Sequence, residues 1–148
     1  MLTTMQINPT GASVELAGLW NRTFHDDPAS IYAFYRQFAG HMDVMVQVDD
    51  HERILSAAHF LPVSYHFFRN EWKGSYLYAA MTDESQRGRG LMSQLMRLRM
   101  QQGAKDGEQF LCTLPAEAEL YSYYGRFGMV PLFALHRATM TRQQLMEH

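Results

Sequence analysis

The sequence has few of the residues that mark disulfide-rich, metal-binding or nucleic-acid-binding proteins. It contains one cysteine, Cys112, which excludes an internal disulfide. Its seven histidines are scattered without a His-x-x-x-His pair, so we expect no metal site. Only two lysines and a net charge of −2 leave no basic face for a phosphate backbone. We therefore expect no nucleic-acid partner.

Long hydrophobic runs are absent as well. Polar residues interrupt every apolar stretch well short of the ~20 residues that a membrane-spanning helix needs. Residues 1–6 lack both the basic start and the apolar stretch of a secretory signal. We therefore expect a cytoplasmic protein with no membrane partner.

Linkers and the motifs of two common enzyme classes are missing too. No repeat, low-complexity tract or Pro/Gly/Ser-rich segment divides the 148 residues, and 47% hydrophobic residues suffice for a core. We therefore predict one domain over residues 1–148. Neither the Gly-x-Ser-x-Gly elbow of hydrolases nor the Gly-Lys-Ser/Thr of a Walker loop occurs.

Apolar spacing and capping residues predict two helices in the first 40 residues. Leu16, Leu19 and Trp20 recur at helical spacing within residues 13–24. Next, Asp27-Pro28 has the form of an N-cap followed by proline at the first helical position, and apolar residues repeat on one face until Gly40. This pattern predicts a second helix between Asp27 and Gly40.

The remaining residues alternate between strand and helix patterns. Valines alternate with other residues over 44–48, and the polar turn 49–52 leads to a second run over 53–60, which predicts an antiparallel hairpin. In the strongest helix pattern, Met92, Met96 and Met100 line one stripe. Further elements follow from apolar runs and glycine or proline boundaries: strands over 75–82 and 110–114, helices over 91–100 and about 116–127, and a final strand or hairpin over 130–140. This order predicts a mixed sheet covered by helices.

The segment Gln86-Arg87-Gly88-Arg89-Gly90-Leu91-Met92 lies between a predicted strand and a predicted helix. Two glycines at alternate positions permit a sharp turn that brings backbone N–H groups close to a ligand. The helix start and the two arginines add positive charge, which suits a phosphate, although glycines that only make a turn are the simpler interpretation. Ser93 stands where a dinucleotide-binding fingerprint needs a third glycine or alanine, so a pyrophosphate loop of another kind remains.

Residues 87–92 resemble the acetyl-CoA pyrophosphate loop of the GNAT superfamily, usually written Q/R-x-x-G-x-G/A. Arg87 and Gly90 occupy the first two fixed positions, and Met92 replaces the final glycine or alanine. Residues 116–129 are similar to the helix of the same family that ends in Y-x-x-x-G-F. There Tyr124 and Gly128 keep the spacing, and Met129 replaces phenylalanine. The resemblance covers about residues 74–130.

The resemblance implies a single α/β (α+β) domain with a mixed, mostly antiparallel sheet of six to seven strands, about four helices and a splayed parallel strand pair. It implies acetyl-CoA as the acyl donor, no metal, and direct attack by a primary amine of a small molecule or protein. Tyr124 matches the family's general acid, which protonates the departing CoA thiolate, and backbone N–H groups would stabilise the oxyanion. The implied cofactor-binding residues are Ala80, Met81, Thr82, Arg87, Gly88, Arg89, Gly90, Leu91 and Met92.

Several alternatives stay open. Candidates for the general base lie on or beside the central strands: His59, His66, Glu71 and Asp83. Acidic residues in loops that flank the family's acceptor site would suit a cationic amine: Asp26, Asp27, Asp49, Asp50 and Glu52. Four aromatic residues either wall that site or pack in the core: Tyr32, Phe34, Tyr35 and Phe38. A non-catalytic acyl-CoA-binding regulatory module is the alternative to an enzyme, and a purely structural domain is a third reading. We expect a monomer or a homodimer.

Overall fold

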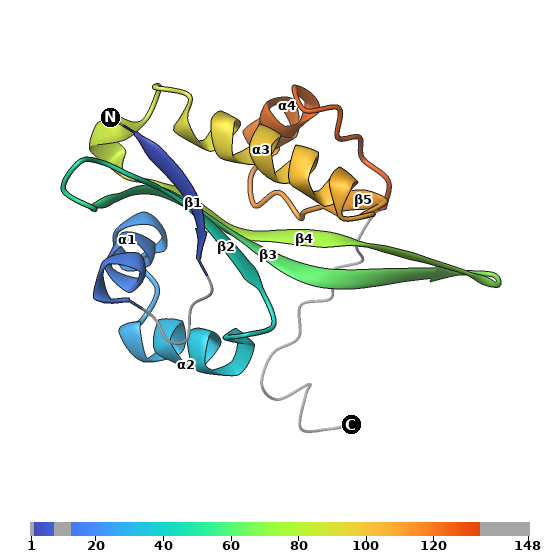
Figure 1. Cartoon of the computed structure of the whole chain (residues 1–148), viewed down its shortest axis with the longest axis horizontal. Helices are drawn as coiled ribbons and strands as arrows, with labels where there is room; N and C mark the ends of the chain where they lie inside the picture. Colours follow the sequence, from blue (N-terminus) through green and yellow to red (C-terminus); the bar gives the residue numbers. More distant parts are fainter. Residues whose placement is uncertain (1, 8–12, 134–148) are drawn as a thin grey trace, which may run out of the picture. The chain divides into compact units, whose positions relative to one another are not determined.

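The computed structural model describes residues 2–7 and 13–133, whose elements are labelled in Figure 1. In chain order these are β1 (Thr3–Ile7), α1 (Val14–Phe24), α2 (Pro28–Phe38), β2 (Asp43–Val48), β3 (Ile54–Phe67), β4 (Asn70–Thr82), a 3₁₀ turn (Glu84–Gln86), α3 (Leu91–Lys105), β5 (Phe110–Cys112) and α4 (Ala118–Gly125). The chain forms two compact units, Met1–Leu114 and Pro115–His148, and α4 belongs to the second. One domain over the whole chain therefore stays a prediction. Within the described ranges no helix combines the length and apolarity needed to cross a membrane.

A five-stranded sheet in the order β1-β2-β3-β4-β5 organises the first unit. All neighbours are antiparallel except β4 and β5, which are parallel. The α+β class with a mixed, mostly antiparallel sheet and four α-helices is confirmed. The described residues give five strands rather than six to seven. Residues 130–133 form no strand, and the rest of the strand or hairpin predicted over 130–140 lies outside the described residues.

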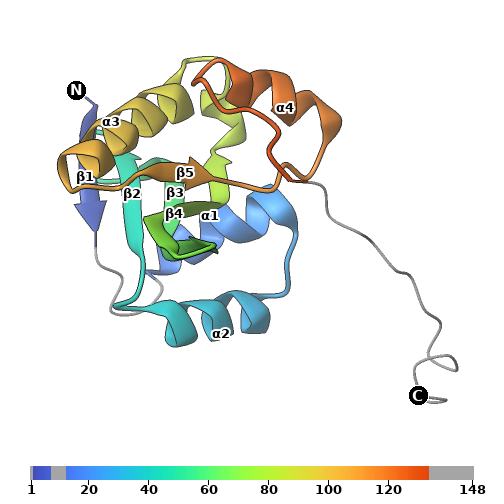
Figure 2. The same ribbon diagram turned by 90° about the vertical axis from the view of Figure 1, so that its right-hand side faces the viewer.

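The two N-terminal helices begin where the capping residues predict. The Ser13 hydroxyl accepts a hydrogen bond from the Leu16 N–H (3.1 Å), and the Asp27 carboxylate accepts one from the Ser30 N–H (3.2 Å) with Pro28 at the first position. Figure 2 shows α1 and α2 on one side of the sheet and α3 on the other. The core between α1, α2 and the sheet contains Leu16, Trp20, Ile31, Tyr35, Val44, Val46, Ala57 and Met81.

Helix α3 packs on the opposite face through a stripe that differs from the predicted one. The buried residues are Leu91, Leu95, Met96, Arg99 and Gly103, whereas Leu98 is 38% exposed and Met92 and Met100 are half-buried. Of the predicted methionine stripe only Met96 is fully buried, and of the leucines beside it Leu91 and Leu95 are buried. The reason for the difference is Arg99, whose guanidinium donates to both carboxylate oxygens of Glu108 and to the Ser75 hydroxyl (2.7 Å), and lies 5.0 Å from the centre of the Phe60 ring.

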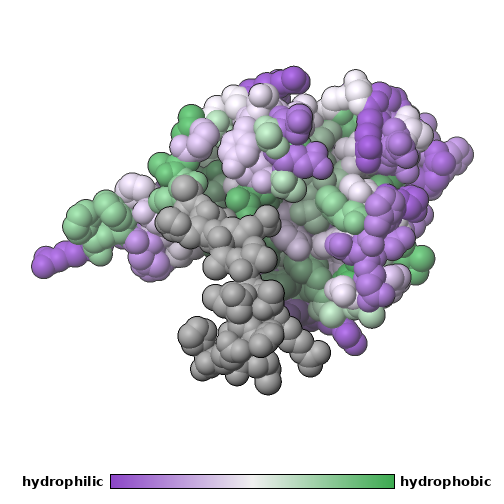
Figure 3. Space-filling model, turned by 180° about the vertical axis from the view of Figure 1, so that it is seen from behind, coloured by the Kyte–Doolittle hydropathy of each residue, from purple (hydrophilic) through white to green (hydrophobic). Residues whose placement is uncertain are grey.

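Strands β3 and β4 extend far beyond the segments predicted from the sequence. The last β2 partner of β3 is Phe60, and β5 pairs with β4 only from Gly74 onward. Residues 64–73 therefore form a two-stranded arm, which projects to the right in Figure 1. Its hydrophobic surface lies behind a hydrophilic tip in Figure 3, and its exposed aromatic residues are Phe67, Phe68 and Trp72.

Candidate functional site

The loop between β4 and α3 is shaped by an acidic cap and two glycines. Asp83 follows β4, and its carboxylate accepts hydrogen bonds from the Ser85 N–H (3.1 Å) and hydroxyl (2.6 Å), which closes the 3₁₀ turn. Gly88 and Gly90 both have φ of 76°, in the left-handed region that favours glycine. Gly90 is the N-cap of α3, and no side chain caps this helix. The loop therefore turns sharply onto the helix axis.

Free backbone donors gather at the start of α3. Within the part of the chain that the structure describes, the N–H groups of residues 88–92 have no hydrogen-bond partner. A Cβ atom placed on Gly88 or Gly90 would meet nothing within 4 Å, so open space lies beside the loop at both glycines. Helix α3 has 15 residues, and its positive dipole end lies at this loop. The arrangement can bind an anion such as a pyrophosphate group through its backbone.

Two exposed arginines flank these donors. The Arg87 Nε lies 3.5 Å from the Thr82 carbonyl oxygen, and Arg89 donates to the Gln86 side-chain oxygen. Among residues 2–7 and 13–133, neither arginine pairs with a carboxylate. Their charge is therefore not neutralised by a described acidic partner. Met92, where the family pattern has a small residue, is half-buried.

Strands β4 and β5 pair over only three residues of each strand. Their parallel pairing comprises Gly74 with Phe110, Ser75 with Leu111 and Tyr76 with Cys112. Beyond it, the Thr113 hydroxyl donates to the Leu77 carbonyl oxygen (3.0 Å), and the described ranges show no further pairing between β4 and β5. Residues 78–82 of β4 therefore have a backbone edge that no described strand covers, as the predicted splayed pair requires.

The free edge of β4 includes the backbone of Thr82. The Asp83 N–H donates to the Leu55 carbonyl oxygen (2.9 Å), and Thr82 is the Cα partner of Ser56. Because backbone groups alternate sides along an antiparallel ladder, Thr82 directs its N–H and C=O away from β3. The contact of its carbonyl oxygen with Arg87 fits this direction.

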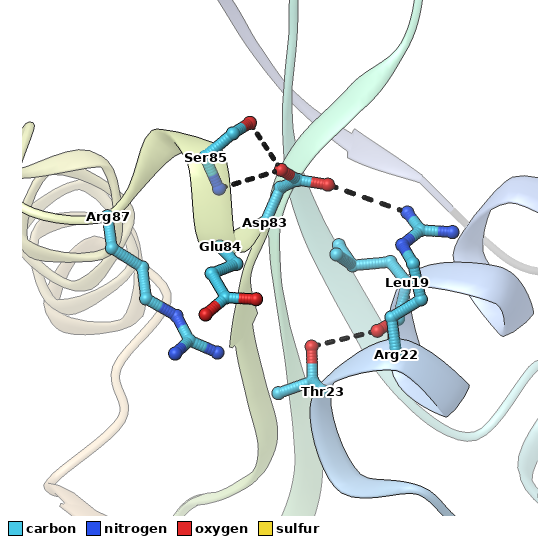
Figure 4. Close-up of a pocket in the computed structure, with 7 residues that line it drawn as sticks. All are labelled: Leu19, Arg22, Thr23, Asp83, Glu84, Ser85 and Arg87. Atoms are coloured by element: carbon cyan, nitrogen blue, oxygen red, sulfur yellow. Dashed lines mark hydrogen bonds and ion pairs between the residues drawn. The ribbon is translucent and has the colours of Figure 1, made fainter.

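A pocket of about 420 Å³ opens beside the loop and the end of α1. Figure 4 shows its lining: Leu19, Arg22, Thr23, Asp83, Glu84, Ser85 and Arg87. Arg22 lies 3.6 Å from Asp83 across it. The Ser85 hydrogen bonds, followed by the charge of Arg22, lower the pKa of Asp83. The pocket thus presents both charges, with Arg22 and Arg87 as its basic and Asp83 and Glu84 as its acidic lining residues.

The predicted cofactor-binding residues lie in two adjoining segments. Ala80, Met81 and Thr82 end β4, and residues 87–92 form the adjoining loop and helix start. The Met81 side chain is 1% exposed within the core, so this side chain does not face a ligand. Leu91 is also buried and anchors the helix start.

Tyr124 lies in the second unit, on α4. Its ring contacts the Tyr123 ring edge-on at 5.4 Å between centroids, and Tyr123 makes the same kind of contact with Phe127. The helix is shorter than predicted, because it ends at Gly125 and the chain turns at Gly128 with φ of 81°. The role of Tyr124 stays a prediction.

The structure distinguishes among the candidate bases and acidic residues. His59 is 0% exposed with both ring nitrogens engaged, so it cannot take a proton from a bound amine. His66 and Glu71 lie 4.0 Å apart on the exposed arm, and Asp83 lines the pocket.

Three of the acidic loop residues have local structural roles. Asp26 accepts from the Trp20 indole (2.8 Å), Asp27 caps α2, and Asp49 pairs with Arg53. Of the four aromatic residues on α2, Tyr35 is in the core, Phe34 and Phe38 pack against it, and Tyr32 is 41% exposed. Core packing therefore accounts for three of the four.

Sequence reasoning missed the partners of two buried polar residues. The contact of Tyr35 with His59 joins residues 24 positions apart, and Arg99 bonds Ser75 at the same separation. No local pattern marks either pair. Among the described residues, no group of three or more histidine, cysteine or acidic side chains could hold a metal ion.

Comparisons with known proteins agree with this geometry. A family model described as an acetyltransferase (GNAT) domain matches residues 10–130. A predicted acetyltransferase with acetyl-CoA from Clostridium acetobutylicum has a TM-score of 0.76 at 11% identity, covering 100% of this chain and 99% of that chain. No curated protein matches the sequence.

Two further solved structures are similar over most of their length. Glucosamine-6-phosphate N-acetyltransferase from Arabidopsis thaliana has a TM-score of 0.70 at 13% identity, covering 95% of this chain and 99% of that chain. An aminoglycoside antibiotic 6′-N-acetyltransferase from Acinetobacter baumannii has a TM-score of 0.70 at 10% identity, covering 95% of this chain and 100% of that chain. At such identities the likeness shows the fold alone.

Proposed function

Because this chain belongs to the GNAT acetyltransferase family, we propose that it is an acetyl-CoA-dependent N-acetyltransferase that acts on a primary amine in a ternary complex. The observation that carries the proposal is the loop at the start of α3. The N–H groups of residues 88–92 have no partner among the described residues, and the loop contains two glycines with φ of 76° that have open space beside them. These donors, with Arg87 and Arg89, suit the pyrophosphate of CoA.

The uncovered edge of β4 supports the same proposal. A pantetheine arm carries amide groups, and the edge beyond the last β5 pair at Tyr76 offers backbone partners for them. The thioester would lie near the end of β4, where Ala80 and Thr82 are the candidate N–H donors to its oxygen. Met81 pairs with Ala57 and, by the ladder alternation, directs its N–H toward β3.

Acetyl-CoA supplies the activated acetyl group, and the protein must handle two protons. The attacking amine has to be neutral, which requires loss of a proton to a base or a water chain, and the CoA thiolate has to be protonated. We assign the second task to Tyr124, the phenol at the family's general-acid position. We leave the base unassigned, with His59 removed from the candidates.

Binding of acetyl-CoA is the first test of this function. Isothermal titration of the wild-type protein should give micromolar affinity, and the double variant Arg87→Ala/Arg89→Ala should weaken it at least tenfold. Arg97→Ala is the matched control, because Arg97 is an exposed arginine further along α3. Absence of binding up to millimolar acetyl-CoA would refute the proposal.

Turnover separates an enzyme from a regulatory acyl-CoA-binding module. Met92 and Met129 depart from the family pattern and favour the module as the second candidate. Incubation with acetyl-CoA and a panel of primary amines should release CoA, detected by chromatography so that the Cys112 thiol does not interfere. Tyr124→Phe should lower kcat about 100- to 10,000-fold without changing acetyl-CoA affinity, and Tyr121→Phe on the same helix should leave kcat unchanged. Tight binding without turnover on any amine would favour the module.

A further inference from the structure

Strand β4 contains a bulge close to the uncovered edge. Ala57 pairs with Met81 and His59 pairs with Tyr78, so two steps along β3 correspond to three steps along β4. Within the bulge Ala79 has φ of 45°, a left-handed conformation that residues with a Cβ rarely adopt. Such a conformation persists only when surrounding contacts hold it.

A buried chain of hydrogen bonds reaches this bulge. The His59 Nδ1 lies 3.1 Å from the Ala79 carbonyl oxygen, and its Nε2 lies 2.7 Å from the Tyr35 hydroxyl. A carbonyl oxygen only accepts, so Nδ1 carries the proton and Nε2 of the neutral ring accepts from Tyr35. Tyr35 and His59 are both 0% exposed, and Trp20 packs on both rings at 5.7 and 5.3 Å. The chain therefore runs from α2 through β3 to the backbone of β4.

Geometry of the peptide unit extends this chain to the free edge. The Ala79 carbonyl and the Ala80 N–H belong to one planar unit, and no cis peptide bond is present in the described residues. In a trans peptide these two groups point in opposite directions. Because His59 holds the carbonyl on its own side, the Ala80 N–H is directed away from His59.

We infer that His59 and Tyr35 are positioning residues, which hold the Ala79–Ala80 peptide so that the Ala80 N–H donates to the oxygen of the bound thioester. This inference rests on the proposed acetyltransferase function. His59 acts through the backbone and touches no substrate, so it differs from a general base. A donor fixed before the substrate arrives stabilises developing negative charge without reorganising during the reaction.

The inference can be tested by NMR without knowledge of the amine. The ¹⁵N–¹H signal of Ala80 should shift when acetyl-CoA binds and shift much less with CoA, which lacks the acetyl oxygen. The difference should disappear in His59→Phe, which keeps a ring but lacks both nitrogens, and reappear in part in His59→Asn, whose amide can still donate toward Ala79. His66→Phe, on the exposed arm, is the control.

A second variant covers the case in which His59→Phe does not fold. Tyr35→Phe removes only the hydroxyl that fixes the imidazole tautomer. Where an amine substrate is found, His59→Phe and Tyr35→Phe should each lower kcat at least tenfold, with the acetyl-CoA dissociation constant within twofold of wild type. A long-range ¹⁵N–¹H spectrum of the wild-type protein should show His59 protonated on Nδ1.

The outcomes separate this inference from the function on which it depends. Failure of the wild-type protein to bind acetyl-CoA would overturn both. Binding with equal Ala80 shifts for acetyl-CoA and CoA, or a His59 ring protonated on Nε2, would overturn the inference and leave the function standing. If the His59 and Tyr35 variants unfold more easily but keep the Ala80 shift difference and the wild-type kcat, the two residues have only a structural role, and the inference is overturned.

Discussion

Protein stability should fall by about 2 kcal/mol when the pH is lowered from 7.5 to 5, and His59 should cause most of the loss. Burial, only partly opposed by hydrogen bonds to the Ala79 and Tyr78 backbone, lowers the pKa of His59 from 6.5 to about 4. The neutral ring is therefore the form that the folded protein holds. Below pH 6.5 the unfolded chain binds a proton at this residue and the folded protein does not, which favours unfolding.

The magnitude follows from the two pKa values. The stabilisation is fully present above pH 6.5 and is lost as the pH falls toward the folded pKa of about 4. Each pH unit below 6.5 lowers the free energy of unfolding by about 1.4 kcal/mol, which amounts to about 2 kcal/mol at pH 5. The titratable side chains that pack on His59 are Tyr35 and Tyr78, and burial raises the pKa of Tyr35, so that phenol stays neutral. The lowered pKa values of Asp49 and Asp83 act mainly at lower pH, where the aspartates of the unfolded chain titrate.

The assay is urea unfolding at pH 7.5, 6.5, 5.5 and 5.0, followed by the fluorescence of Trp20, which contacts the His59 ring. The wild-type protein should lose about 2 kcal/mol of unfolding free energy between the extremes. His59→Phe should be less stable at pH 7.5, because the Tyr35 hydroxyl loses its partner, but its stability should change much less with pH. Equal slopes in both proteins would show that His59 does not carry the pH dependence and would refute the reasoning.

Three further predictions concern other parts of the fold. Gly90→Ala should cost about 1–2 kcal/mol at a left-handed position and weaken acetyl-CoA binding, as measured by urea unfolding and titration; an unchanged affinity would mean that the loop shape does not matter for the ligand. Glu108→Ala leaves the buried Arg99 charge without its main partner and should cost about 3 kcal/mol, the low end for a buried pair because Glu108 is partly exposed, as measured by urea unfolding. Asp27→Ala removes the α2 cap and should cost about 1 kcal/mol in thermal unfolding, whereas Asp27→Asn should cost less.

Local signals in the sequence were enough to place most helices and the candidate ligand loop. Ser13 and Asp27 predicted the starts of α1 and α2 because an N-cap acts on N–H groups two or three residues away. The two glycines before α3 predicted a sharp turn, and both have positive φ. Each of these features depends only on residues that are close together in the chain, so the sequence alone was enough to predict it.

Strand extent was less accessible from the sequence. Strand β1 is too short to show a clear alternating pattern in the sequence, and it is held in the sheet by its pairing with β2. Strands β3 and β4 continue to Phe67 and Asn70 because they pair with each other. The segment that pairs with a strand can be remote in sequence, so the residues of the strand alone do not specify its partner or its length. The same dependence applies to the buried face of α3. Arg99 is buried there because its guanidinium bonds Ser75 in β4 and Glu108, which the sequence pattern of the helix does not indicate.

The sequence by itself thus determined the class of fold, the helix starts and the glycine loop, because short-range sterics and hydrogen bonds fix them. Only the tertiary structure decided the register of β3 against β4, and with it the bulge at Ala79 and the contact of His59 with its carbonyl. Two consecutive alanines carry no local signal for a bulge. The bulge absorbs a mismatch of one residue between two long strands, and the strand that sets this register is remote in sequence.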